Sequence, residues 1–291
     1  MITVPQARML AQEHVYRPIT GKFICLGRQW IRMTHEEAVA VLREEGVQIP
    51  DATIRATAGM IDNYSRYAIG QNYITDHAFF TMFGLDRVYS LDVSEYEKCD
   101  VVHNLNYRIP PDLAGQYDFI YDGGTFDHLV DLKNCFTNVI EMLKPGGRVF
   151  QLNAASNFTG AAYVSFGPDL FHDYYSLNKF ADCKVYIAEA DNLGQVFDWD
   201  MYYFENPTCY RHLMSPRLHM VIVMAEKASD STTDRLPVQA QYRDPDVAAQ
   251  YTEGHARIAQ SRRPVWRCRA PKAGSTAHAP ASEGFRYLGQ L

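Results

Sequence analysis

The sequence predicts an α/β protein with a doubly wound, mostly parallel sheet of seven strands and helices on both faces. Between residues 22 and 227, short apolar runs rich in β-branched residues alternate with segments of helical period, the pattern of a parallel sheet covered on both sides. Seven of these runs are strand candidates, at residues 22–27, 87–93, 100–105, 117–122, 148–154, 183–190 and 218–226.

The clearest helix signal follows the fourth strand candidate. In residues 126–147, apolar side chains from Leu129 to Leu143 recur at intervals of three and four and form one face. Asp131 is placed to cap the helix, and Pro145 with the two glycines after it ends the helix, because proline lacks an amide donor and glycine accepts positive φ. Two more helices are expected, at 168–180 behind a first-turn proline and at 34–46 behind a capping box.

The alternating pattern divides the chain into a main domain, residues 1–227, and a tail, residues 228–291. The main domain carries two insertions, 28–72 and 193–217, and Trp199 in the second is expected either to close over a site or to pack a homodimer. The tail has few large aliphatic residues, so we expect it to be largely disordered, with room for a short helix around 246–260.

Composition narrows the class of partner. The formal net charge is -6 and the pI is near 5.9, so nucleic acid is not expected to bind, and a small molecule is favoured. No apolar run is long enough to cross a bilayer, and the first residues do not read as a secretion signal. The six cysteines show no paired spacing, which is typical of free thiols. We therefore expect a cytoplasmic protein without membrane contact.

Polar residues end three successive strand candidates. Asp92 ends one, Asn104, Leu105 and Asn106 end the next, and Asp122 with Gly123 and Gly124 ends the third. Ligands of open α/β sheets bind at this edge, where an acidic side chain can accept both hydroxyl protons of a ribose. Asp92 suits that role, with a strand-end cap as the alternative. The asparagines suit adenine, with a turn as the alternative.

Two motifs in the same block carry a family resemblance. The runs YDFIYDGGTFDHL and MLKPGGRVF, at their observed separation, resemble class I S-adenosylmethionine-dependent methyltransferases over Arg87 to Lys227. The resemblance implies a Rossmann-like sheet whose last strand is antiparallel, and S-adenosylmethionine as cofactor. It also implies Asp92 on the ribose, Asn104 to Asn106 near the adenine, and Asp122 to Thr125 beside the methionine part.

The first loop departs from the family's pattern. No G-x-G-like turn precedes Asp92 at the usual distance, and Gly27 stands where the first loop glycine belongs. No G-x-G-x-x-G or G-K-[ST] motif is present, which disfavours NAD(P) and nucleoside triphosphates, whereas S-adenosylmethionine has no pyrophosphate to cradle. A catalytically degenerate protein that keeps the fold as a binding partner or scaffold is the alternative.

The expected reaction is methyl transfer to oxygen or nitrogen of a small polar acceptor, such as a sugar or a natural-product intermediate. His128 is the candidate base, because it follows the cofactor strand end and titrates near neutral pH, with a helix-start histidine as the alternative. Asn157, Tyr163, His172 and Tyr202 are candidates for the acceptor pocket. Asp127 and His128 resemble the family's acidic-His pair, and we predict no metal site.

Overall fold

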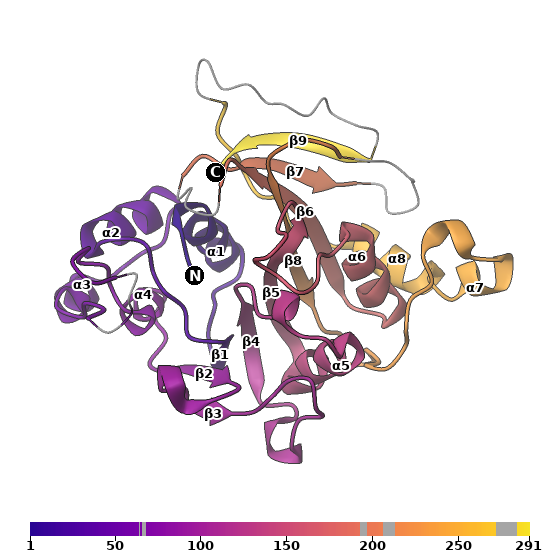
Figure 1. Ribbon diagram of the computed structural model, residues 1–291, viewed down its shortest axis with the longest axis horizontal. Coiled ribbons are helices and arrows are strands. Elements are labelled where there is room, and N and C mark those ends of the chain that lie inside the picture. Colours follow the sequence, from indigo (N-terminus) through magenta and orange to yellow (C-terminus); the bar gives the residue numbers. More distant parts are fainter. Residues whose placement is uncertain (64, 66–67, 193–196, 206–212, 272–283) are drawn as a thin grey trace.

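The computed structural model describes residues 1–291 except 64, 66–67, 193–196, 206–212 and 272–283 (Figure 1). Its described residues form one nine-stranded sheet in the order β3-β2-β1-β4-β5-β8-β6-β7-β9. The strands are β1 (Phe23–Leu26), β2 (Val88–Asp92), β3 (Val101–Val102), β4 (Tyr117–Asp122), β5 (Leu143–Ser156), β6 (Asp182–Ala190), β7 (Asp200–Phe204), β8 (Leu218–Glu226) and β9 (Phe285–Gln290).

Seven of these strands correspond to the seven candidates, and the sheet changes direction part of the way across. Strands β1 to β5 pair in parallel, whereas β8 runs antiparallel between β5 and β6, as expected of the last predicted strand. The prediction of seven strands was too low. β7 comes from the second insertion and β9 from the tail, and both extend the edge beside β6 in antiparallel pairs.

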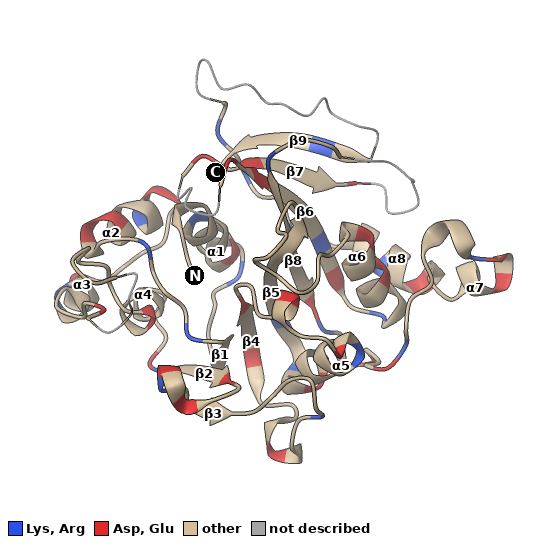
Figure 2. Ribbon diagram, in the orientation of Figure 1, with Lys and Arg blue, Asp and Glu red and all other residues tan. Residues whose placement is uncertain are grey.

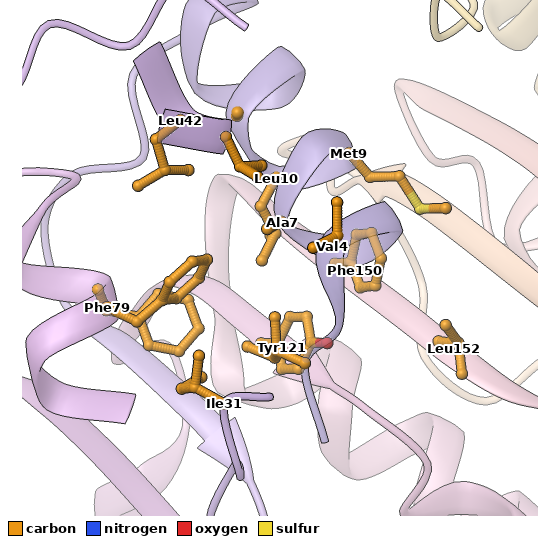
Figure 3. Close-up of a cluster of buried hydrophobic side chains, with 14 of the residues drawn as sticks. Val4, Ala7, Met9, Leu10, Ile31, Leu42, Phe79, Tyr121, Phe150 and Leu152 are labelled. Atoms are coloured by element: carbon orange, nitrogen blue, oxygen red, sulfur yellow. The ribbon is translucent and has the colours of Figure 1, made fainter. Parts of the chain in front are cut away.

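Helices cover both faces, as predicted. One apolar cluster packs α1 (Val4–Tyr16), α2 (His35–Glu44) and α4 (Asp76–Thr81) on the sheet, and Figure 3 shows Leu10, Phe79, Tyr121 and Phe150 meeting there. The other cluster packs α5 (Leu132–Met142), α6 (Pro168–Leu177) and α8 (Thr252–Gln260) on the opposite face. Two short helices, α3 (Asp51–Thr57) and α7 (Pro245–Ala249), complete the described set. None of the helices described has the length and apolar character that crossing a bilayer requires.

The helix boundaries follow the sequence signals. The Asp131 carboxylate accepts a hydrogen bond from the Asn134 amide at the start of α5, and Thr34 and Glu37 form the capping box of α2. α5 ends at Met142, so Leu143, predicted on the helix face, is instead the first residue of β5. A Cβ on Gly147 would lie 2.8 Å from the Lys144 carbonyl oxygen, so only glycine fits in the irregular first part of β5, where a turn was expected.

The tail was predicted to be largely disordered, and its described residues are ordered instead. Arg263 is 1% exposed and forms ion pairs with Glu13, Asp182 and Glu226. The Trp266 ring stacks on Tyr186 at 4.1 Å, and its indole N–H donates to Glu13 at 2.9 Å. The tail therefore gains its order from the Arg263 ion pairs and the Trp266 contacts together with buried apolar residues such as Ile258, Phe285 and Leu291.

We predict that Arg263→Met destabilises the protein by about 3 kcal/mol, because buried Glu13 and Asp182 would lose their shared cation and keep only the more distant Arg148, at 3.8 Å, and Lys184, at 3.2 Å, among the described residues. Urea unfolding of the full chain measures the loss. The exposed neighbour provides the control, since Arg262→Met should change stability by less than about 0.5 kcal/mol. Equal effects of the two substitutions would contradict the role given to the Arg263 ion pairs.

Candidate functional site

The strand register brings the predicted signals to one edge of the sheet. Leu26 lies opposite Leu91 on one side and Asp122 on the other, so Gly27 and Asp92 follow side by side. Gly27 has a φ of +73°, and its amide donates to the Leu91 carbonyl at 2.7 Å. A Cβ on Gly27 would lie 3.9 Å from Asp92 Oδ2, so this carboxylate stands next to the first loop.

Asp122 holds the turn that follows β4. Its fully buried carboxylate accepts from the amides of Gly124 at 3.2 Å and Thr125 at 2.7 Å, and from Asn153 Nδ2 at 2.9 Å. Burial raises the pKa of Asp122 to about 6, against the effect of these donors. Thr125 Oγ1 donates to the Leu26 carbonyl at 2.8 Å and joins the ends of β4 and β1. Both side chains thus position the loop.

The asparagines after β3 shape a turn. Asn104 Oδ1 accepts from the backbone amide of Asn106 at 3.0 Å, the geometry of an Asx turn. Asn106 Oδ1 accepts from the amides of Val130 and Asp131, which fixes the start of α5. Leu105 is buried against that helix, and its carbonyl accepts from Asn138 Nδ2 at 3.0 Å. The turn alternative raised by the sequence accounts for these side-chain bonds.

Gln29 takes the place of a second loop glycine. Its Nε2 donates to the carbonyls of Leu26 at 3.1 Å and Gly27 at 3.3 Å, so a side chain closes the turn after β1. A Cβ on Gly123 would lie 2.5 Å from Gln29 Oε1, which shows how closely Gln29 covers the turn after β4. Sequence reasoning missed Gln29 because a lone glutamine in a loop carries no motif.

Asp92, Glu95 and Glu97 gather where β2 ends, and Figure 2 shows acidic positions in red beside this end of the strand. A cavity of about 480 Å³ lies beside them, lined by residues of the first insertion, of the start of α4 and of the turn after β2: Arg28, Gln29, Trp30, Asp62, Ser65, Thr75, Asp76, Tyr96, Glu97 and Lys98. Burial raises the pKa of Asp76, and burial together with the Asp92 charge raises the pKa of Glu97. Both shifts reflect carboxylates that are poorly solvated beside the cavity.

A second cavity, of about 730 Å³, lies where both insertions meet the edge of the sheet. Arg32 and Gln71 of the first insertion and Trp199 of the second line it together with β5 and β8 residues Leu152 and Met220. Trp199 is 4% exposed and lines this cavity within a single chain, as expected of a residue that closes over a site. Trp30 lines both cavities and separates them.

Asp127 and His128 line the larger cavity with Gly123 and Gly124. Asp127 Oδ2 accepts from the Ala154 amide at 3.1 Å, but Oδ1 is buried and accepts no hydrogen bond from the part of the chain that the structure describes. His128 Nε2 lies 3.7 Å from Asp127 Oδ1, on a side chain that is 55% exposed. Burial raises the pKa of Asp127 despite the opposing influence of His128.

The four predicted acceptor residues lie outside the described lining of this cavity. Tyr163 is 80% exposed, and its ring lies 6.5 Å from that of His128 at the rim. Asn157 Nδ2 donates to the Ser215 carbonyl at 3.3 Å and also to that of Arg217. Tyr202 and His172 lie on the opposite face of the sheet, against the second apolar cluster. Phe158 and Ala161, beside Asn157, reach the cavity instead.

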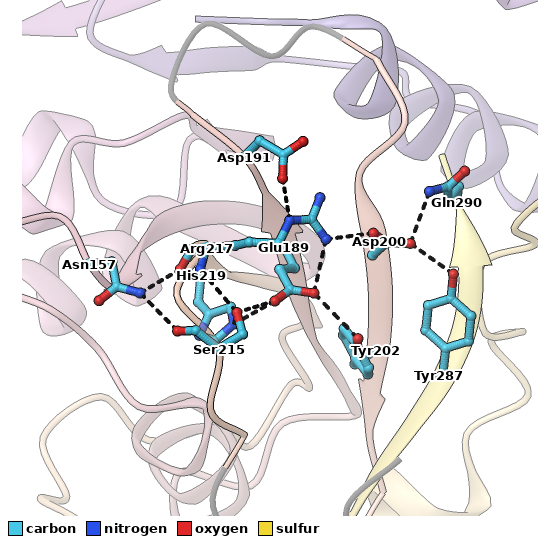
Figure 4. A network of polar contacts seen from close by, with 10 residues as sticks. All are labelled: Asn157, Glu189, Asp191, Asp200, Tyr202, Ser215, Arg217, His219, Tyr287 and Gln290. Carbon is cyan, nitrogen blue, oxygen red and sulfur yellow. Dashed lines mark hydrogen bonds and ion pairs between the residues drawn. The ribbon is translucent and has the colours of Figure 1, made fainter. Parts of the chain in front are cut away.

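Asn157 and Tyr202 belong to one buried polar network at the ends of β6 and β8 (Figure 4). At its centre, Glu189 receives hydrogen bonds from Ser215 and Arg217, and His219 Nε2 lies 3.4 Å from Glu189 Oε1. Asp200 pairs with Arg217 at 2.6 Å and accepts from Tyr287 and Gln290 of β9. The network therefore ties the two added strands to the sheet. In the sequence, the signal for this network was a titratable residue inside an apolar run, Glu189 in the run of β6 and His219 in the run of β8.

We predict that Glu189→Gln weakens the fold in a pH-dependent way. Burial alone would raise the pKa of Glu189, but donors His219 and Ser215 and the Arg217 charge lower it to about 2. A lowered folded-state pKa adds stability above the unfolded value near 4.5, and that stability is lost as the pH falls toward 2. Urea unfolding should show the gap between wild type and variant shrinking from pH 6 to pH 3. A gap that widens on acidification would contradict the assignment.

No family model matches the sequence, and no curated protein matches it. Solved structures do. One is 1,6-didemethyltoxoflavin-N1-methyltransferase of Burkholderia thailandensis with 1,6-didemethyltoxoflavin and S-adenosylhomocysteine, at 13% identity over 78% of each chain and a TM-score of 0.35. Another is a SAM-dependent methyltransferase of Archaeoglobus fulgidus, at 10% identity over 77% of this chain and 95% of that one, with a TM-score of 0.38.

A third is phosphoethanolamine N-methyltransferase 2 of Haemonchus contortus with S-adenosyl-L-methionine, at 12% identity and a TM-score of 0.37. That match covers 76% of this chain and 52% of the longer one. All three matched proteins are methyltransferases. Identities and TM-scores this low do not decide what the present chain binds, so its function is argued from its own residues.

Proposed function

We propose that this protein binds S-adenosylmethionine at the carboxyl edge of β1, β2 and β4 and methylates a small polar acceptor. The observation that carries the proposal is the buried Asp127 Oδ1, which accepts no hydrogen bond from the described chain and lines a cavity of about 730 Å³ beside Gly123 and Gly124. A buried carboxylate oxygen in that position needs a donor or a cation, and a sulfonium or ammonium group supplies the charge.

The residues present fit the cofactor's polar groups. Asp92 Oδ2 lies beside Gly27, which has a positive φ, and there it would accept hydrogen bonds from the hydroxyls of a ribose. The smaller cavity lies beside this end of β2. Asp127 would face the methionine part from the turn that Asp122 holds. Asn104, Asn106, Asp122 and Thr125 support this arrangement by holding the loops, since their side chains are used in internal hydrogen bonds.

Electrostatics favour this cofactor over a dinucleotide. Asp76 and Glu97 line the smaller cavity, where Arg28 is paired with Asp76 at 2.7 Å, and Asp127 lines the larger cavity. A wall with these carboxylates disfavours a pyrophosphate, and β1 is followed by eight residues before α2 begins rather than by the short glycine turn onto a helix amino end that pyrophosphates use. The same wall attracts a cofactor whose sulfonium and amino groups are positive.

The bound cofactor would supply a methyl group on a good leaving group, so the protein mainly has to align the acceptor. The larger cavity offers apolar walls from Trp199, Phe158 and Met220 with Arg32 as a cation, which suits a small molecule with polar substituents. His128 lies at the rim, where its exposed imidazole would take the acceptor's proton and pass it to water. We propose acceptors of the sugar or natural-product class, methylated on oxygen or nitrogen.

A catalytically degenerate binding protein is the second candidate. Gln29 favours it, because its side chain closes the first loop and covers Gly123 where the family has open glycines. The two functions differ in one outcome. A scaffold of this fold that keeps the pocket binds S-adenosylmethionine without turnover of any acceptor, whereas the enzyme consumes it once the acceptor is supplied.

We predict that two substitutions distinguish the contact with the sulfonium from the contact with the ribose. Asp127→Asn should weaken the binding of S-adenosylmethionine by about tenfold or more and the binding of S-adenosylhomocysteine far less, because only S-adenosylmethionine carries the sulfonium charge. Asp92→Ala should weaken both ligands alike, by about 10- to 100-fold, because both carry the ribose. Calorimetric titration measures the four affinities.

The exposed Asp112 supplies a matched control, and Asp112→Asn should leave both affinities unchanged. Equal losses for the two ligands in Asp127→Asn would remove Asp127 as the sulfonium partner. Wild-type affinity in a folded Asp92→Ala variant would remove Asp92 from the ribose.

We predict that His128→Asn lowers kcat by about 10²- to 10⁴-fold with the identified acceptor, while cofactor affinity stays at the wild-type value. A rise of the variant's residual rate with pH, as hydroxide replaces the base, accompanies the loss. Steady-state kinetics and calorimetry test this together, with His103→Asn as the control histidine. Unchanged turnover in His128→Asn would eliminate it as the base.

A further inference from the structure

A second cluster of ligand-type side chains lies on the opposite face of the sheet from the cavities. His172 and Asp173 come from α6, and His255 comes from α8 in the tail. One nitrogen or oxygen atom from each lies within 4.8 Å of the other two. Tyr251 and Phe204 pack their rings beside the two histidines, so the cluster is enclosed.

The cluster holds acceptor atoms that the described chain does not satisfy. Asp173 is 2% exposed, and its Oδ1 is buried without a hydrogen bond among the described residues, as is His255 Nε2. The other carboxylate oxygen of Asp173 forms an ion pair with Arg243 at 2.5 Å. His172 Nδ1 lies 3.3 Å from Ser176 Oγ, which leaves Nε2 as its ligand atom. One free atom per residue is what a metal site requires.

Burial dominates the electrostatics of the cluster. Burial, with the neighbouring His255 and the charges of Arg243 and Lys184, lowers the pKa of His172 to about 3. Burial also lowers the pKa of His255. Burial, against the effect of the Arg243 ion pair, raises the pKa of Asp173 to about 6.

Arg243 is the element that argues against a cation, and its geometry resolves the conflict. The guanidinium contacts Asp173 Oδ2 and stacks over the Tyr251 ring, with its carbon 3.5 Å from the ring centroid. Its ion-pair contact is with Oδ2, and Oδ1 is left without a hydrogen bond among the described residues. A group that holds the second oxygen of a ligating carboxylate orients the first, the usual role of an outer partner in metal sites.

We propose that His172, Asp173 and His255 form a binding site for a divalent transition metal of the zinc class. Two imidazoles and one carboxylate are ligands that such ions accept, with a fourth position left for water. In a tetrahedral site with bonds of about 2.0–2.1 Å the ligand atoms lie about 3.4 Å apart, so side chains whose ligand atoms lie within 4.8 Å of one another have to close by at most about 1.4 Å. The metal would clamp α8, and with it the ordered tail, onto α6. The site does not depend on the methyltransferase proposal.

Titration of the chelator-treated full chain with Zn²⁺ and, separately, Co²⁺ tests the site. We expect one equivalent to bind, a rise in Tm, and visible Co²⁺ absorption of a tetrahedral site containing nitrogen. His255→Gln, which leaves the Asp173–Arg243 pair intact, should weaken binding at least tenfold and abolish the rise in Tm. His77→Gln, an exposed histidine on α4, should bind as the wild type does.

Absence of one-equivalent binding by the wild type would overturn the proposal, whatever the behaviour of the variants. Equal affinity of His255→Gln and wild type would also overturn it, because the metal would then sit elsewhere. A Co²⁺ spectrum of a fully hydrated octahedral ion would lead to the same conclusion. S-adenosylmethionine affinity should be the same with and without the metal, which keeps this test separate from the cofactor site.

Discussion

The buried carboxylate of Asp122 is the interaction on which the candidate site depends. It binds two amides of the turn after β4 and the side chain of Asn153 on β5. Asn153 Oδ1 in turn accepts from the Asp127 amide, and Asp127 Oδ2 accepts from the Ala154 amide. This chain of hydrogen bonds places the second Asp127 oxygen on the cavity wall and His128 at the rim. An alanine at position 122 would leave three donors without their shared acceptor.

The two insertions turn an open sheet edge into an enclosed site. The first departs from the end of β1 through Arg28 and Gln29 and returns to α4, where Ile61 bridges Ile74. The second contributes Trp199 and β7, and the Glu189 network anchors that strand. The tail then completes the edge through β9, and its Arg263 ion pairs reach back to α1. Segments that lie outside the expected parallel sheet thus build much of the environment around the cavity.

The sequence predicted the fold well because hydrophobic period is a local signal. Six of the seven strand candidates fall within a few residues of the observed strands, and β3, expected at 100–105, keeps two residues, Val101–Val102. β5 starts at Leu143 rather than 148, since Pro145 and the glycines sit in a bent strand start and not in a separate turn. β7 and β9 escaped notice because polar residues and a glycine interrupt their apolar runs, Asp200 at the start of β7 and Arg286 and Gly289 within β9.

The site was predictable in its position and less so in its contacts. The positions of Gly27, Asp92 and Asp122 were predictable from the strand ends, because parallel pairing aligns the carboxyl ends of β1, β2 and β4 at one edge of the sheet. Which side chains face a cavity depends on long-range packing, so His172 and Tyr202 could not be assigned to a face from the sequence. The tail's order rests on Arg263 finding three acids that lie 37 to 250 residues away, a contact with no local signature.

The most direct test of the central claim is calorimetric titration of the wild-type protein with S-adenosylmethionine and S-adenosylhomocysteine, with NADH as the comparison ligand. An acidic edge built around Asp92 and Asp127 predicts micromolar binding of the first two, tighter for the sulfonium, and none for the anionic dinucleotide. Binding of NADH alone, or of none of the three, would contradict the account.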